Sequence, residues 1–303
     1  MYTQAASPIS TLFTVTKELW RHFIMIVIYV IGIELLDLRF HLENYNFPVP
    51  VVAILGTVIG LILAFRTNSC YGRWWEARTL WGAIVNDSRS WTRQILTFTS
   101  EIDSETDQRQ RRMAHRQIAW CYALSRALRG QSTTQDLVGI LSSEEIEQCK
   151  KSQNVPNDLL LRQGHELRRL YDQGHLELFQ FVEMEQTLTR LTNWMGGCER
   201  IKNTTFPGSY TRLVNALIYL FVIFLPFGLV GVPAFGLITT SVAFAMAFLM
   251  IDRVSIFLQD PFSCRPSDTP MLALSRTIEI NIREMLGETE LPEKMQAVDG
   301  VLN

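Results

Sequence analysis

The chain has 303 residues, of which 48% are hydrophobic and 19% charged, and its formal net charge is −2. This balance is richer in apolar residues than a soluble enzyme needs and too polar for a protein lying wholly in lipid, so we expect a membrane part and an aqueous part. The small net charge gives no indication of nucleic acid binding. Five cysteines, scattered singly, predict free thiols in a reducing cytosol rather than a zinc site or disulfides.

Three apolar regions follow one another along the chain. The first, at about 20–36, is short for a membrane span, and its pattern fits a buried core helix equally well. The second, at 47–65, carries no charge and predicts a span. The third, at 213–251, is also uncharged, but a single helix of that length would extend about 58 Å, which is more than a bilayer. Prolines and glycines at 226–236 predict a tight turn there, which gives two spans and a total of four.

The distribution of arginines predicts the orientation in the membrane. Eleven arginines lie between Arg66 and Arg129, whereas the link at 37–46 holds one. The excess of positive charge on cytoplasmic segments then places both termini and the middle section in the cytoplasm.

The middle section shows helical periodicity throughout, and Ser142, Ser143 and Glu145 resemble the start of a capped helix. We therefore expect an all-α fold whose membrane helices continue into a helical cytosolic domain. The expected organisation is an N-terminal segment with spans one and two (1–65), a cytosolic helical domain (66–212), spans three and four (213–251), and a cytosolic C-terminal helix and tail (252–303).

No pattern of catalytic residues is present in the sequence. The five histidines have no metal-ligand spacing, and no nucleotide-binding loop or nucleophile motif appears, so we expect no enzyme, no cofactor and no metal site. Glu34 and Asp252 are better candidates for a function, because charges beside a membrane are costly. Asp252 next to Arg253 also fits a simple marker of the membrane interface.

The second apolar region carries two stripes at helical spacing. Thr57, Leu61 and Phe65 are four residues apart and share one face, while Gly56 and Gly60 form a small-residue stripe beside it. Small residues let membrane helices approach closely. Several copies packed through these glycines would turn Leu61 and Phe65 toward a common axis and build a narrow apolar tube, although a GxxxG pair also occurs in ordinary helix packing.

The segment that follows resembles a known family. FRTN-x-x-Y-x-RWWEAR-x-x-W-G at 65–82 is similar to the signature of bestrophins, specifically their bacterial branch. CERIKNTTFPGSYTRL at 198–213, LPFGLV at 225–230, DPF at 260–262 and RTIEINIREMLGE at 276–288 resemble further segments of that family in the same order. The residues that carry the first motif are Arg66, Arg73, Trp74, Trp75, Glu76 and Arg78.

The resemblance implies a homopentameric channel with a central pore lined by the second helix. Its hydrophobic neck maps onto Thr57, Leu61 and Phe65, with Phe65 as the tightest ring. Relatives usually carry Ile at the position of Thr57, so the outer end of this neck is expected to be wider or wetter. A second, cytosolic aperture is expected at Phe179.

The resemblance also implies what the channel carries. The RWWEAR segment groups the chain with bacterial members in the inner membrane, which favours monovalent cations such as sodium or potassium. The alternatives are a chloride channel of the same family and a non-conducting membrane scaffold. Animal members have an aspartate-rich calcium clasp after DPF, but residues 263–270 hold one acid here, so no calcium activation through that segment is expected.

Overall fold

The computed structural model describes residues 8–40, 48–99, 104–265 and 267–297, and every regular element among them is helical apart from one isolated bridge between Val138 and Leu141. The chain divides into two compact units, which we describe separately. The membrane unit comprises Met1–Trp74 and Thr205–Asp260, and the polar unit comprises Trp75–Thr204 and Pro261–Asn303. The prediction that both termini are cytoplasmic concerns 1–7 and 298–303, which lie outside the described residues.

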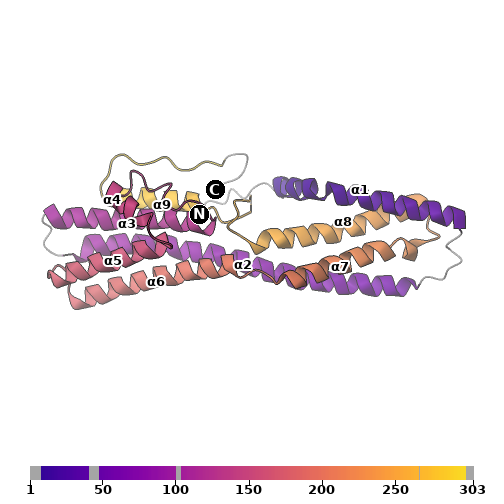
Figure 1. Cartoon of the computed structure of the whole chain (residues 1–303), viewed down its shortest axis with the longest axis horizontal. Helices are drawn as coiled ribbons and strands as arrows, with labels where there is room; N and C mark the ends of the chain where they lie inside the picture. The colour runs from indigo at the N-terminus through magenta and orange to yellow at the C-terminus, as the bar shows by residue number, and fades with distance from the viewer. Residues whose placement is uncertain (1–7, 41–47, 100–103, 266, 298–303) are drawn as a thin grey trace. The chain divides into compact units, whose positions relative to one another are not determined.

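The membrane unit is built from long apolar helices. α8 packs against both α1 and α7 (Figure 1). The Tyr29 hydroxyl of α1 donates a hydrogen bond of 2.8 Å to the backbone oxygen of Ile223 in α7. Its elements are α1 (Pro8–Phe40), the first half of α2 (Val49–Phe98), α7 (Gly208–Phe224), the 3-10 turn η2 (Phe227–Leu229) and α8 (Ala234–Gln259).

Three helical segments among the described residues are long and apolar enough to cross a membrane, namely Val49–Phe98, Gly208–Leu229 and Ala234–Gln259. The predicted break inside 213–251 is present, because α7 ends at Phe224 and Gly231 takes a φ of +86°, a conformation that glycine adopts without strain. α1 is not one of the three, so the count of four spans stays a prediction.

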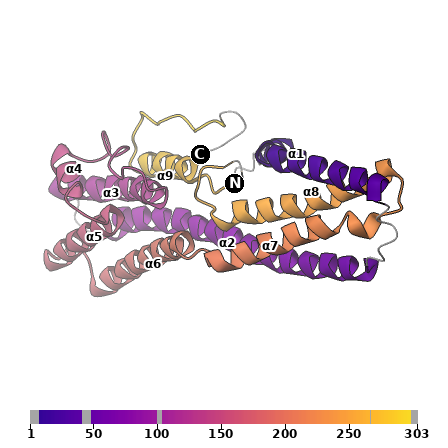
Figure 2. The same cartoon turned by 45° about the vertical axis from the view of Figure 1, so that its right-hand side comes forward.

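The polar unit is a bundle arranged around α3. The middle of α3 is buried on all sides, since it packs against α5, α6 and α9 (Figure 2). A helix buried all round is a core element rather than an amphipathic surface helix. The elements of this unit are the second half of α2, α3 (Ser104–Leu128), α4 (Ser143–Cys149), α5 (Val155–Asp172), α6 (Leu178–Asn203) and α9 (Met271–Met285).

Two helix starts follow from local sequence. The Ser142 hydroxyl accepts a hydrogen bond of 3.3 Å from the backbone N–H of Glu145, as the predicted cap requires. α6 begins at Leu178, after a turn at Gly174, which takes a φ of +80°.

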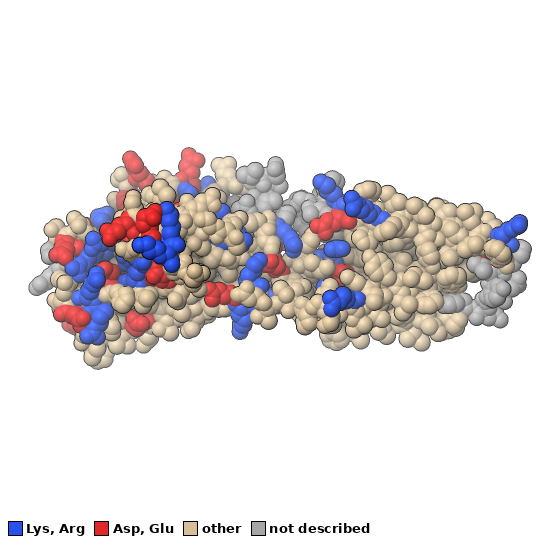
Figure 3. Space-filling view, viewed as in Figure 1, with Lys and Arg blue, Asp and Glu red and all other residues tan. Residues whose placement is uncertain are grey.

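The surfaces of the two units differ in charge. Lysine, arginine, aspartate and glutamate gather over the polar unit, while the surface of α1, α7 and α8 is largely uncharged (Figure 3). Large apolar side chains of the membrane unit, such as Ile28 and Ile54, are exposed in the single chain. An exposed apolar surface of this extent needs lipid or another protein surface to cover it.

Candidate functional site

One face of α2 is exposed along the length of the helix in the single chain. Its exposed positions are separated by alternating steps of four and three residues, which is the heptad spacing of helices that wrap around neighbouring helices. We call this face the α2 stripe. Along its part in the membrane unit, the residues are first apolar and then, toward the C-terminal end, small or polar. The stripe consists of Ile54, Val58, Leu61, Phe65, Asn68 and Gly72, followed in the polar unit by Trp75, Thr79, Gly82, Asn86, Arg89 and Arg93.

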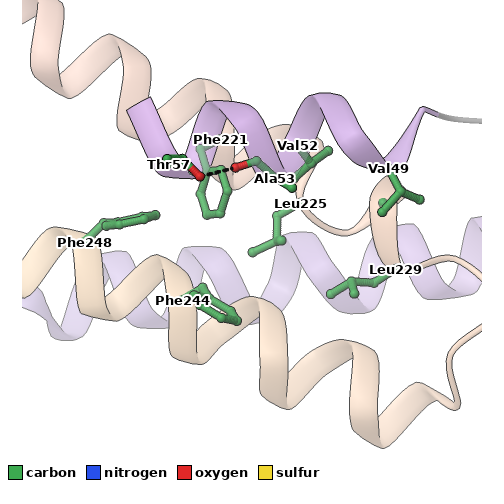
Figure 4. A pocket seen from close by; sticks show the side chains of 11 residues that line it. Val49, Val52, Ala53, Thr57, Phe221, Leu225, Leu229, Phe244 and Phe248 are labelled. Carbon is green, nitrogen blue, oxygen red and sulfur yellow. Dashed lines mark hydrogen bonds between the residues drawn. The ribbon is translucent and has the colours of Figure 1, made fainter. Parts of the chain in front are cut away.

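The predicted neck residues lie on this exposed side of α2. The exposed fractions are 58% for Leu61 and 65% for Phe65, and Thr57 is also exposed. The Thr57 hydroxyl donates a hydrogen bond of 2.9 Å to the backbone oxygen of Ala53 one turn earlier (Figure 4). Because its single proton is used there, the hydroxyl offers only its lone pairs to water or to an ion.

The two glycines of the predicted packing stripe have different surroundings. A Cβ added to Gly56 would come within 2.9 Å of Cε2 of Phe221, so this glycine lets α2 approach α7 of the same chain. A Cβ added to Gly60 would meet no atom within 4 Å. The close packing at Gly56 is therefore within the chain, whereas Gly60 stays open and keeps its predicted role toward a neighbouring copy.

An apolar cavity of about 390 Å³ lies beside Thr57, the outermost residue of the predicted neck. Phe221 of α7, Leu225 just after it, and Phe244 and Phe248 of α8 project toward the first two turns of α2, and Thr57 lies at one end (Figure 4). The cavity is therefore an apolar space next to Thr57, which forms the outermost predicted ring. A shift of α7 or α8 at these side chains would therefore reach Thr57 directly.

A buried ion pair lies one residue after Phe65, the last residue of the predicted neck. Nη1 of Arg66 is 2.5 Å from Oδ1 of Asp252, and both side chains are almost completely buried between α2 and α8. Nearby, the hydroxyl oxygens of Thr67 and Ser255 are 2.7 Å apart. The sequence singled out Arg66 and Asp252 separately and did not predict that they form a pair. The one signal that could have suggested the pair is that each residue directly follows an uncharged run and that their charges are opposite.

The remaining motif residues contribute to packing and to polar contacts of α2. Nε of Arg73 donates a hydrogen bond of 3.1 Å to the backbone oxygen of Gln259 at the end of α8, and the ring of Trp74 lies 5.6 Å from that of Tyr71. In the polar unit, Glu76 forms an ion pair with Arg200 of α6. Trp75 is exposed on the α2 stripe, and Arg78 is partly buried.

The predicted cytosolic aperture residue is among the most exposed apolar side chains of the described part of the chain. Phe179 is 86% exposed in the first turn of α6. Glu183 is one turn further on the same face and is also exposed. The aromatic ring is therefore free to meet another copy or to line an opening, and an acidic group accompanies it.

These features define a helical protein with membrane-length apolar helices and an exposed face along α2. Comparison with known proteins gives the family: the profile described as bacterial/fungal bestrophin protein matches residues 9–284. The chain belongs to the bestrophin family. The prediction made from the RWWEAR motif and the later segments is thereby confirmed.

Relatives with names and solved structures agree with this membership. The chain is 33% identical over 249 residues to the voltage-dependent anion channel-forming protein YneE of Salmonella typhi, covering 82% of this chain and 80% of that protein. It is 32% identical over 254 residues to the voltage-dependent anion channel-forming protein RSc3414 of Ralstonia nicotianae, covering 83% and 82%. A crystal structure of a bacterial bestrophin homologue from Klebsiella pneumoniae superposes with a TM-score of 0.80 at 31% identity, covering 88% and 98%.

These comparisons bear on two predictions made from the sequence, namely that the protein is not an enzyme and that it conducts cations. The family and its named relatives are ion channels, so the chain is a channel-family protein rather than an enzyme. The preference for cations finds no support, because the names of the relatives specify anions. The chloride alternative is thus better supported than the cation prediction.

Proposed function

We propose that several copies of this chain, five by the family resemblance, surround a central pore in a cell membrane and conduct anions. The observation that carries the proposal is the α2 stripe, a heptad-spaced face of one long helix that is exposed in the single chain. A heptad-spaced face is buried when copies of a helix pack around an axis. Such packing would bring the rings of Leu61 and Phe65 to the axis and form the neck.

The neck would control conduction by the cost of dehydration. An ion in an apolar ring loses water without gaining polar ligands, so it crosses only when the constriction is wide enough to stay wetted. Phe65 presents the largest side chain of the stripe in the membrane unit, and Leu61 is one turn further out. Thr57 follows with a hydroxyl oxygen that can accept hydrogen bonds from water, which makes the outer end the wetter one.

The sign of the charges on α2 supports anions. No acidic residue occupies any position of the α2 stripe, and its two charged positions, Arg89 and Arg93, are positive. Arg89 donates two hydrogen bonds to the amide oxygen of Asn281, at 3.0 and 2.7 Å, and these leave its charge uncompensated. A positive ring lowers the energy of an approaching anion and raises that of a cation. The names of the relatives point the same way.

One observation favours the cation alternative. If Phe179 lines the cytosolic aperture, then Glu183 on the same face of α6 places a carboxylate beside it, and five copies would form an acidic ring. The selectivity between anions and cations would then depend on whether the ion is least hydrated near the arginines of the α2 stripe or near the ring of Glu183. Glu183→Gln separates the two possibilities, because it removes the acidic ring and leaves the α2 stripe intact.

The test is the reversal potential of the purified protein in planar bilayers or liposomes under a sodium chloride gradient. We expect a reversal potential near the chloride equilibrium value. Phe65→Ala should raise the conductance several-fold, because a wider neck is wetted more easily. Phe235→Ala is the matched control, since it removes another exposed phenylalanine, at the start of α8 and outside the predicted neck.

Each outcome separates the alternatives. A reversal potential near the sodium equilibrium value that shifts in Glu183→Gln would establish the cation channel and reject the anion proposal. An equal response of Phe65→Ala and Phe235→Ala would reject the neck assignment. If a folded, oligomeric preparation passes no current in either variant, the protein is a non-conducting scaffold.

A further inference from the structure

A second cavity, of about 360 Å³, lies wholly within the polar unit. Tyr122 of α3 and one face of α9 form two of its walls, and the loop before α4 forms the third. We call it the α3–α9 cavity. Its lining residues are Tyr122, Asp136, Val138, Gly139, Ile140, Arg276, Glu279 and Arg283. This volume falls within the range of about 300–1,000 Å³ of small-molecule sites.

The carboxylates of the cavity are already satisfied. Glu279, whose side chain is 7% exposed, accepts hydrogen bonds from the Tyr122 hydroxyl at 2.7 Å and from Nε of Arg283 at 3.0 Å. Asp136 accepts two bonds from Arg126, of 2.6 and 3.1 Å, one on each oxygen. Neither acid offers an uncompensated negative charge to a ligand, so the cavity is not a cation site.

The free hydrogen-bonding capacity of the cavity belongs to Arg276. Its described interactions, with the Tyr122 hydroxyl at 3.0 Å and with Glu279 at 3.3 Å, both use Nε. Nη1 and Nη2 make no hydrogen bond among the described residues, and the side chain is 31% exposed. Two parallel N–H groups of a guanidinium match the two oxygens of a carboxylate.

Tyr122 holds this guanidinium in place. Burial and the hydrogen bond to Glu279 raise the pKa of Tyr122, so its hydroxyl stays protonated, donates to Glu279 and accepts from Arg276. The orientation of the Arg276 side chain is therefore set before a ligand arrives. A preorganised donor pair loses less entropy on binding than a free arginine does.

The rest of the cavity selects the size and charge of the ligand. The charged groups that line it, together with their partners Arg126 and Glu288, are three arginines and three acids, so the formal charge is balanced. A single negative charge is easier to accommodate there than the double charge of phosphate. Val138, which is 78% exposed, and Ile140 add an apolar wall at the opening.

From this arrangement we propose that the α3–α9 cavity binds a small organic monocarboxylate. The carboxylate is held by Nη1 and Nη2 of Arg276, and its short apolar body rests against Val138 and Ile140. The ligand would tie α9 to the loop before α4. The proposal concerns the polar unit alone and is independent of which ion the channel conducts.

The test is isothermal titration of the purified full-length protein with butyrate, with butylammonium as the cation of similar size and inorganic phosphate as the smaller polyanion. We expect saturable binding of butyrate, at least tenfold weaker binding of phosphate and none of butylammonium. Arg276→Gln should weaken butyrate binding tenfold or more, and Arg276→Lys should weaken it less. Arg168→Gln, at an exposed surface ion pair of α5, is the matched control and should leave binding unchanged.

A variant that keeps Arg276 guards against a folding defect. Val138 is exposed, so Val138→Trp disturbs no core contact and should block the opening and abolish binding. If Arg276→Gln has a weaker helical circular dichroism signal or a changed elution volume in size exclusion, the effect of Val138→Trp on butyrate binding alone tests the proposal. Absence of butyrate binding by the parent protein, or binding that neither variant weakens, would overturn the proposal. Tighter binding of phosphate than of butyrate would overturn the choice of ligand class.

Discussion

Arg66 and Asp252 form an ion pair of 2.5 Å, buried between α2 and α8, and Arg66 directly follows Phe65. Burial removes both charges from water, so each depends on the other for compensation. The pair therefore fixes the rotation of α2 at the residue next to the neck. It also ties the α2 stripe to α8, so that Phe65 points away from the helices of its own chain.

We expect Asp252→Asn to destabilise the membrane unit by about 3–5 kcal/mol, because it leaves the Arg66 charge buried and unpaired. Thermal unfolding of the detergent-solubilised protein, followed by circular dichroism, would show a lower midpoint. The double variant Arg66→Met with Asp252→Leu should recover most of the loss, since apolar residues need no compensation there. A double variant less stable than Asp252→Asn would show that the pair contributes net stability.

The two glycines of α2 should respond differently to alanine. Gly56→Ala places a Cβ 2.9 Å from the Phe221 ring, and we expect a loss of about 1–3 kcal/mol from overpacking. Gly60→Ala meets nothing within the chain and should gain up to about 1 kcal/mol of helix propensity in the single chain. Light scattering after size exclusion checks the assembly. A smaller oligomer in Gly60→Ala alone would place a neighbouring copy at Gly60, whereas unchanged assembly would contradict that packing.

Thr57→Ile should lower the single-channel conductance. The change replaces a hydroxyl group, whose oxygen can accept a hydrogen bond from water, by an ethyl group, so the outer ring becomes drier and the cost of dehydration rises. Thr57→Ser keeps the hydroxyl and should conduct like the parent protein. If Thr57→Ile conducts as much as the parent, the outermost ring does not limit the current.

Two buried thiols of the polar unit should make the stability of the fold decrease at alkaline pH. Burial raises the pKa of Cys121 and of Cys198 to about 12, from an ordinary value of 9.0. Between pH 9 and 12 the folded protein keeps protons that the unfolded chain releases. The free energy of unfolding should therefore fall as the pH rises through this window, by about 1.4 kcal/mol per pH unit for each thiol.

The midpoint of thermal unfolding measured from pH 8 to 11 checks this dependence. Cys121→Ala and Cys198→Ala should each show a shallower decline, whatever their stability at pH 8. At pH 8 iodoacetamide should modify the partly exposed Cys264 and leave both buried thiols intact in the folded protein. Equal slopes in all three proteins would contradict the assignment.

Much of the fold could be predicted from local pattern. The uncharged run at 47–65 and the Pro- and Gly-rich break inside 213–251 predicted membrane-length helices and the turn between α7 and α8. The cap at Ser142 was also predictable, because a helix start depends on residues a few positions apart.

The sequence by itself determined the class of this protein: its uncharged runs, its all-helical pattern and a family signature that later comparison confirmed. These properties are local, because hydropathy and motif spacing are read within a few tens of residues. Only the tertiary structure decided that Arg66 meets Asp252, that Gly56 faces Phe221 while Gly60 stays open, and that Arg276 keeps free donors in a cavity. Those relationships join residues far apart in the chain, and their existence depends on how the helices pack rather than on any pattern along one of them.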